Sequence, residues 1–130
     1  MARNRSLRWC IFLLGSLLLV GCAPDSLELN ETNSGSNITL RTGGTFTVSL
    51  EGNPTTGYAW EVVECDEQVL KLTGEDYVSS SDKIGAGGIK MFTLTAANPG
   101  TTALKLVYRR SWEKDVEPLR TFVANVRVTR

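Results

Sequence analysis

Apolar and polar residues alternate over most of this 130-residue chain, with the period of two that is typical of β-strands. The clearest case is Phe46, Val48 and Leu50, which alternate with hydroxyl-bearing residues. Turn-like stretches separate such runs, and no run of ten or more residues has a helical period. The pattern predicts an all-β sandwich of about seven antiparallel strands, at residues 38–40, 45–50, 58–63, 69–73, 89–96, 102–108 and 120–128.

The first 36 residues depart from this pattern. Three early arginines precede an apolar stretch at residues 11–20, which is typical of an export signal and shorter than a membrane span. The stretch ends in Leu19-Val20-Gly21-Cys22, which resembles a bacterial lipobox; a plain secretory signal with a chance cysteine is the alternative. We expect a lipoprotein signal peptide at residues 1–21, a lipidated Cys22 with a flexible tether at 22–36, and a folded domain at 37–130.

These features predict an exported protein that is lipid-anchored to the cell envelope through Cys22. Ala23 follows the cysteine, where lipoproteins retained at the inner membrane commonly have aspartate. The residue therefore favours the outer membrane or the cell surface.

Charge and cysteine content narrow the picture further. The full chain has 14 basic and 14 acidic residues, and removal of residues 1–21 deletes three arginines and no acid, which leaves a net charge of −3. No basic patch with interleaved aromatic residues points to nucleic acid. Apart from Cys22, Cys65 is the only cysteine of the mature chain, so an internal disulfide is not expected and the core must supply the stability.

The chain contains no histidine, which removes the commonest general base and the commonest zinc ligand. Cys65 has no histidine partner that would make it a nucleophile. The neighbouring acids at positions 64, 66 and 67, and at 75 and 76, lie in polar turn-like stretches and are expected to be solvated. We therefore expect no enzymatic activity, no metal site and no cofactor.

Three unusual loops separate the predicted strands. The first contains Asn53-Pro54-Thr55-Thr56-Gly57, in which proline and glycine restrict the backbone. The second contains Gly85-Ala86-Gly87-Gly88, and the third contains Arg110-Ser111-Trp112. If successive strands run in opposite directions, these alternate connections lie at one end of the sandwich, as the recognition loops of immunoglobulin variable domains do. Trp60, in the middle of an alternating run, is expected in the core.

The three loops resemble those of the chagasin-type inhibitors of papain-family cysteine proteases. That family has an N-P-T-T-G-[FY]-x-W block, a G-x-G-G loop and an R-P-W loop, in this order. The first two are complete here, at Asn53 to Trp60 and at Gly85 to Gly88, whereas Ser111 replaces the proline of the third. The resemblance covers nearly all of the chain from Ile38 onward and implies an immunoglobulin-like β-sandwich.

The resemblance also implies a function: reversible, non-covalent inhibition in which the three loops occlude the cleft of a papain-like enzyme. Thr55 and Thr56 would lie nearest the catalytic groups of the enzyme, and Asn53, Pro54 and Gly57 would hold the loop's shape. Tyr58 would contact the enzyme or pack under the loop, residues 85–88 would offer bare backbone, and Arg110, Ser111 and Trp112 would form the third contact. We expect a monomer, and the alternative is a non-inhibitory surface binding or adhesion module that uses the same loops.

Overall fold

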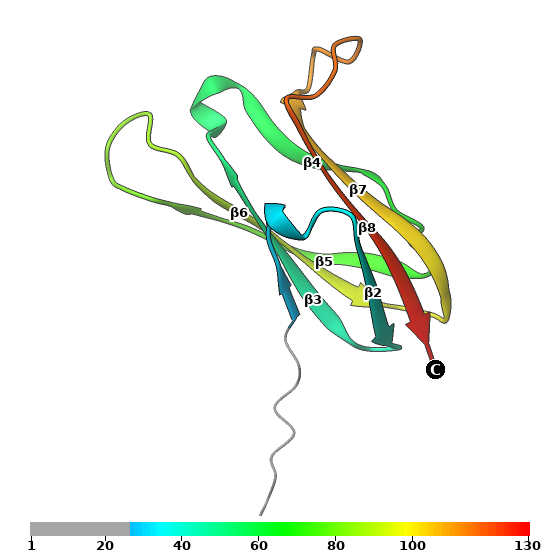
Figure 1. Ribbon diagram of the computed structural model, residues 1–130. Helices are drawn as coiled ribbons and strands as arrows, with labels where there is room; N and C mark the ends of the chain where they lie inside the picture. Colours follow the sequence, from blue (N-terminus) through cyan, green and yellow to red (C-terminus); the bar gives the residue numbers. More distant parts are fainter. Residues whose placement is uncertain (1–26) are drawn as a thin grey trace, which may run out of the picture.

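The computed structural model of the chain describes residues 27–130 (Figure 1). Two four-stranded sheets pack face to face, one in the order β1-β3-β6-β5 and the other in the order β2-β8-β7-β4. Two short 3₁₀ turns, η1 (Glu31–Asn33) and η2 (Pro54–Thr56), complete the regular structure. The strands are β1 (Leu27–Leu29), β2 (Ser36–Arg41), β3 (Thr45–Gly52), β4 (Tyr58–Glu64), β5 (Leu70–Ser79), β6 (Gly88–Ala96), β7 (Gly100–Arg110) and β8 (Arg120–Thr129).

The predicted all-β sandwich is confirmed, and each of the seven predicted strands is present. Two features differ from the prediction. Strands β1 and β2 pair in parallel with β3 and β8, so both sheets are mixed rather than antiparallel. Between these two strands, η1 carries the chain from one sheet to the other.

The second difference lies in residues 22–36, which were expected to be a flexible tether. Residues 27–36 of this range form β1, η1 and the start of β2. Leu29 is buried in the core, and its burial outweighs the polar composition of its neighbours. The signal peptide at residues 1–21, Cys22 and the rest of the expected tether lie outside the described residues.

The alternating positions meet in one core between the sheets. Phe46, Phe92 and Phe122 are almost completely buried, together with the leucines and valines that share their faces. Burial of a side chain of this size stabilises the fold by about 1.5–3 kcal/mol. Trp60 is only 5% exposed, so its predicted core position is confirmed. Tyr108, at 7% exposed, closes the core at the end where the three unusual loops begin.

The predicted grouping of the three loops at one end of the sandwich is confirmed as well (Figure 1). Gly52, the last residue of β3, pairs with Gly88, the first residue of β6. In the other sheet Tyr58, the first residue of β4, pairs with Arg110, the last residue of β7. The β3–β4, β5–β6 and β7–β8 connections therefore leave the sandwich together.

The described chain starts at the opposite end. Leu27 pairs in parallel with Phe46, near the beginning of β3, whereas the first loop follows the end of that strand. In Figure 1 the start of β1 accordingly lies on the side away from the loops. Between residues 27 and 130, no helix is long and apolar enough to cross a membrane.

Candidate functional site

The first loop is a single 3₁₀ turn held by its own side chains. Asn53 caps the turn, because its Oδ1 accepts hydrogen bonds from the Thr55 amide at 3.1 Å and the Thr55 hydroxyl at 2.5 Å. The Thr56 hydroxyl donates back to the Asn53 carbonyl at 2.6 Å. Pro54 occupies the first helical position, where its missing N–H costs nothing. The sequence thus builds a stiff turn with Pro54, Thr55 and Thr56 exposed on its outside.

Gly57 ends this turn and cannot be replaced without strain. Its φ of 84° lies in the left-handed region, which favours glycine. A Cβ atom on Gly57 would lie 2.7 Å from Cη2 of Trp112, so the indole of the third loop packs directly against the first. The first and third loops are therefore in contact through a glycine.

The second loop is the connection between β5 and β6. The Ser80 amide donates to the Gly87 carbonyl at 2.9 Å and closes the loop, while Gly88 already belongs to β6. A Cβ atom on Gly88 would lie 2.2 Å from the Val78 carbonyl oxygen, which explains this glycine by packing rather than by ligand contact. The Asn53 side-chain amide donates to the Gly85 carbonyl at 3.0 Å and joins the second loop to the first.

The third loop opens with a tight turn in which the Glu113 amide donates to the Arg110 carbonyl at 3.0 Å. Ser111 and Trp112 form the tip of this turn, and Trp112 is 68% exposed. The Arg110 Nε donates to the Thr56 carbonyl at 3.3 Å, and the guanidinium also pairs with Glu113. The third loop is thus bonded to the first by Arg110 and packed on it by Trp112.

Tyr58 supports the loops from below. Its ring stacks on Tyr108, with 5.5 Å between ring centroids, and the guanidinium carbon of Arg110 lies 4.6 Å from the Tyr58 centroid. Tyr58 also packs against the buried core. Two roles were expected for this residue, contact with the enzyme or packing under the loop, and these contacts correspond to packing.

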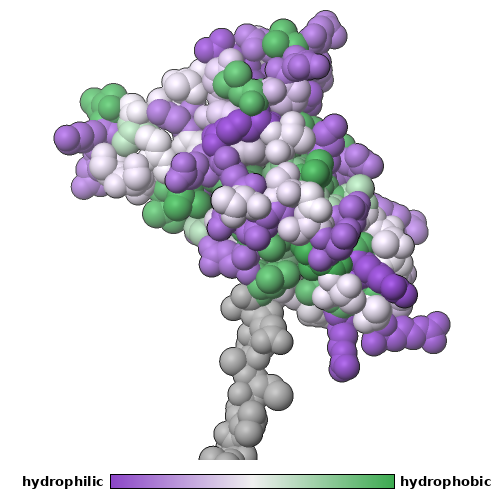
Figure 2. Space-filling model, viewed as in Figure 1, coloured by the Kyte–Doolittle hydropathy of each residue, from purple (hydrophilic) through white to green (hydrophobic). Residues whose placement is uncertain are grey.

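The outer surface of the joined loops includes apolar residues that the sequence motifs did not indicate. Ile84 is fully exposed in the second loop, and Val116 and Leu119 are exposed in the third. Figure 2 shows hydrophobic surface at the tip of the β5–β6 loop and beside the β7–β8 loop. The sequence could have indicated these residues, because each is an apolar residue within an otherwise polar loop. These apolar residues lie on separate loops, and single exposed apolar residues of this kind are common on protein surfaces.

Chemistry of a catalytic kind is not apparent in residues 27–130. They contain no group of three or more potential metal ligands. Burial, reinforced by Glu67 and then Asp66, raises the pKa of the Cys65 thiol, which therefore remains protonated and unreactive at neutral pH. The acidic residues 64, 66, 67, 75 and 76 are exposed, as expected, but Glu64, Glu75 and Asp76 lie in strands β4 and β5 and not in turns, because β5 extends to Ser79.

A small β-sandwich with three joined loops at one end defines a recognition domain of the immunoglobulin-like type. Residues 39–126, which include all three loops, match the sequence profile of the protein family described as Chagasin family peptidase inhibitor I42. The chain therefore belongs to the chagasin family of peptidase inhibitors, and the family resemblance of the loop motifs is confirmed. Members of this family are inhibitors and not enzymes.

Individual relatives agree with this assignment. Amoebiasin-1 of Entamoeba histolytica is 36% identical over 105 residues, which cover 78% of this chain and 99% of that protein. Chagasin of Trypanosoma cruzi is 29% identical over 92 residues, or 67% of this chain and 84% of that protein. The crystal structure of a cysteine protease inhibitor from Entamoeba histolytica matches with a TM-score of 0.71 and 28% identity, covering 79% of this chain and 95% of that one.

Substitutions at Asn53 are expected to separate its two side-chain roles. Asn53→Ala removes the cap and the link to Gly85, at a cost of about 1 kcal/mol in stability. Asn53→Asp keeps the capping oxygen but places a second oxygen against the Gly85 carbonyl. We expect the alanine variant to shift the amide signals of both Thr55 and Ala86 in ¹H–¹⁵N spectra, and the aspartate variant to shift mainly that of Ala86. Equal shifts in both variants would show that the two roles are not separable.

Proposed function

We propose that the domain inhibits papain-like cysteine proteases reversibly and without covalent chemistry, acting as a monomer that fills the active-site cleft with its three loops. The observation that carries this proposal is the direct bonding of the three loops to one another. Asn53 joins the first loop to the second, and Arg110 and Trp112 join it to the third. Membership of a peptidase-inhibitor family and the similarity to Amoebiasin-1 and Chagasin also support the proposal.

Rigid loops make a good wedge because little conformational entropy is lost when they dock. Thr55 and Thr56, exposed on the 3₁₀ turn, are the groups that would enter deepest, next to the catalytic cysteine and histidine of the enzyme. The glycine loop would approach closely with its main chain, since residues 85 and 87 carry no side chain. Trp112 would lie flat on the enzyme beside the first loop. The domain would need no nucleophile of its own.

The purified domain should discriminate between mechanistic classes of protease. We expect reversible inhibition of papain or a cathepsin L-like enzyme and no inhibition of trypsin, because the exposed residues of the first loop include no basic side chain that would fill a trypsin specificity pocket. Titration of each enzyme with the domain lacking residues 1–22 measures this directly. Equal inhibition of both enzymes would contradict the proposed selectivity, and inhibition of neither would favour the non-inhibitory adhesion alternative.

The two described tryptophans should behave in opposite ways. Trp112→Ala should weaken inhibition about tenfold to a few hundredfold, as expected for a central interface residue, and should leave the melting temperature nearly unchanged. Trp60→Ala should remove about 3–5 kcal/mol of stability, because it opens a cavity in the core. Inhibition constants and thermal melts of both variants test the contrast. An early-melting Trp112→Ala variant that inhibits normally would reverse our assignment of core and interface.

We further propose that the protein is an exported lipoprotein, held at the outer membrane or cell surface by acyl chains on Cys22. The support is the lipobox-like Leu19-Val20-Gly21-Cys22 at the end of an apolar stretch. The position of Leu27 at the end away from the loops fits this proposal. Four residues lie between Cys22 and Leu27, so the two Cα atoms are at most about 17 Å apart when the chain is extended. A domain tethered so closely would direct its loops away from the membrane.

Replacement of the anchor residue tests this second proposal. Cys22→Ser should leave the protein soluble or unprocessed, because stable anchoring needs the several acyl chains that lipidation of this cysteine supplies. Cys65→Ser is the matched control, which removes a thiol from the folded domain and should still partition with detergent. Detergent partitioning of the Cys22→Ser protein at the wild-type level would exclude the anchor.

A further inference from the structure

Arg120 lies under the three loops without belonging to any of the loop motifs. It is the first residue of β8 and pairs with Tyr108 on β7, which in turn pairs with Trp60 on β4. The three side chains form a row across the inner face of one sheet. The guanidinium carbon lies 4.4 Å from the Tyr108 ring centroid and 5.2 Å from that of Trp60, distances at which cation–π attraction is significant.

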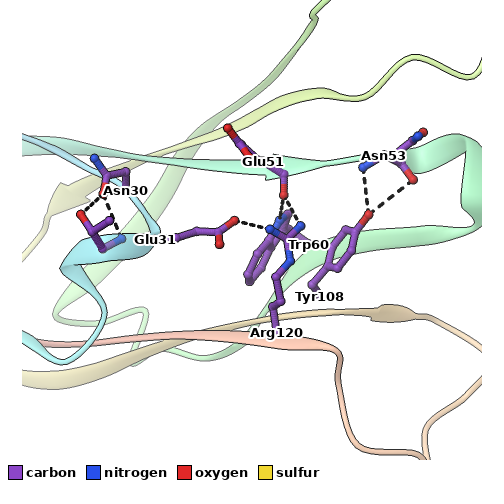
Figure 3. A network of polar contacts seen from close by, with 8 residues as sticks. Asn30, Glu31, Glu51, Asn53, Trp60, Tyr108 and Arg120 are labelled. Atoms are coloured by element: carbon purple, nitrogen blue, oxygen red, sulfur yellow. Dashed lines mark hydrogen bonds and ion pairs between the residues drawn. The ribbon is translucent and has the colours of Figure 1, made fainter.

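The same guanidinium connects this row to the other sheet and to the N-terminal segment (Figure 3). Its Nη2 donates to the main-chain carbonyl of Glu51, near the end of β3, and its Nη1 pairs with the carboxylate of Glu31 in η1. Trp60 donates to the same Glu51 carbonyl through Nε1 at 2.9 Å. Arg120 thus holds together segments that are distant in sequence, at the point where the sheets begin to diverge into loops.

Glu31 is itself held in place. Asn30 caps η1 by accepting a hydrogen bond from the Thr32 amide at 2.9 Å, and Asn33 accepts one from the Asn30 amide at 2.9 Å. This reciprocal capping box fixes the turn that presents Glu31 to Arg120. The carboxylate is therefore positioned by its own turn and not only by the ion pair.

Two routes lead from Arg120 to the first loop. The Tyr108 hydroxyl, whose ring lies against the guanidinium, accepts a hydrogen bond from the Asn53 amide at 2.8 Å. The Glu51 carbonyl that Arg120 binds lies two residues before Asn53 in the chain. Asn53 then sets the 3₁₀ turn and its link to the second loop. Replacement of Arg120 is therefore expected to change the conformation of the exposed turn, because Tyr108 and Glu51 connect it to Asn53, which caps that turn.

We propose that Arg120 is a positioning residue for protease inhibition, which fixes the base of the first loop through Tyr108 and Glu51, and that Glu31 supports it from the N-terminal segment. This inference rests on the proposed inhibitory function. Loss of the Arg120 contacts would leave the first loop in its docking conformation for only part of the time. The apparent inhibition constant rises by the reciprocal of that fraction.

The test compares Arg120→Ala with Arg127→Ala, which removes the same charge from the same strand. Arg127 is exposed and pairs with Thr101 and Thr39 at the end away from the loops. Against papain, well below the melting temperature, we expect the inhibition constant to rise about tenfold for Arg120→Ala, if the competent fraction falls to about a tenth, and to change less than about twofold for Arg127→Ala. In the free domain, only Arg120→Ala should shift the amide signals of Asn53 and Gly57.

Other outcomes would overturn the proposal. If Arg120→Ala melts earlier but inhibits like the wild type, the residue is purely structural. If it inhibits poorly with unchanged loop signals, Arg120 contacts the protease itself. Should the alanine variant fail to fold, Arg120→Lys serves in its place, because lysine keeps the charge but loses the planar, multiply donating group. Failure of the wild-type domain to inhibit would refute the proposed function, and the loop signals would still decide whether Arg120 holds the turn.

Discussion

The loop end of this domain depends on Asn53, whose amide, carbonyl and side-chain oxygen and nitrogen are all engaged in hydrogen bonds. A polar residue bonded on every side fixes backbone and side chain together, because a shift of one group would break bonds made by the others. The first loop is thereby held in shape before any partner arrives. The second loop is bonded to it directly, and the third packs on the glycine that ends its turn. Asn53 thus links directly two loops that lie 32 residues apart in sequence, and the turn that it caps carries the contacts with the third.

Beneath Asn53, aromatic rings and guanidinium groups form a layer on the β4-β7-β8 side, and Arg120 and Trp60 join this layer to the other sheet at the Glu51 carbonyl. Arg110 lies on Tyr58, Tyr58 stacks on Tyr108, and Arg120 lies on Tyr108 from the other side. Such a layer is held firmly, because the rings stack on one another and each guanidinium group is also bonded to a main-chain carbonyl and a carboxylate. It provides a base on which a short turn can withstand the forces of docking. The pattern explains why a domain without disulfides or metal in its described part can present ordered loops.

Much of this arrangement was predictable from the sequence, and the reasons for the exceptions are physical. Strict alternation revealed the strands and the core position of Trp60, and the order of the loops implied their grouping. Strand β1 was missed because three residues are too few to show a period, and its burial rests on Leu29 alone. The parallel pairings of β1 and β2 join distant parts of the chain and leave no local pattern.

The roles of Tyr108 and Arg120 were also missed, for a related reason. Tyr108 resembles any other inward residue of an alternating strand, and Arg120 resembles an ordinary charged residue at a strand end. Only the register of β8 against β7, and of β7 against β4, brings them into one row with Trp60. Tyr58 was assigned to the right place, but its contacts could not be chosen from sequence. The motifs therefore indicated which loops lie together, while the residues beneath them emerged only from the pairing of strands.

The central claim is that the three loops act together by filling a protease cleft and not by chemistry at the catalytic cysteine. Binding of the domain to papain, measured by calorimetry, tests it most directly when the enzyme is prepared in two inactive forms. Papain with its catalytic cysteine replaced by alanine should bind the domain with nearly unchanged stoichiometry, because the cleft remains open. Papain whose cleft is occupied by a covalently bound peptidyl inhibitor should not bind it. Equal binding to both forms would place the contact outside the cleft and contradict the account.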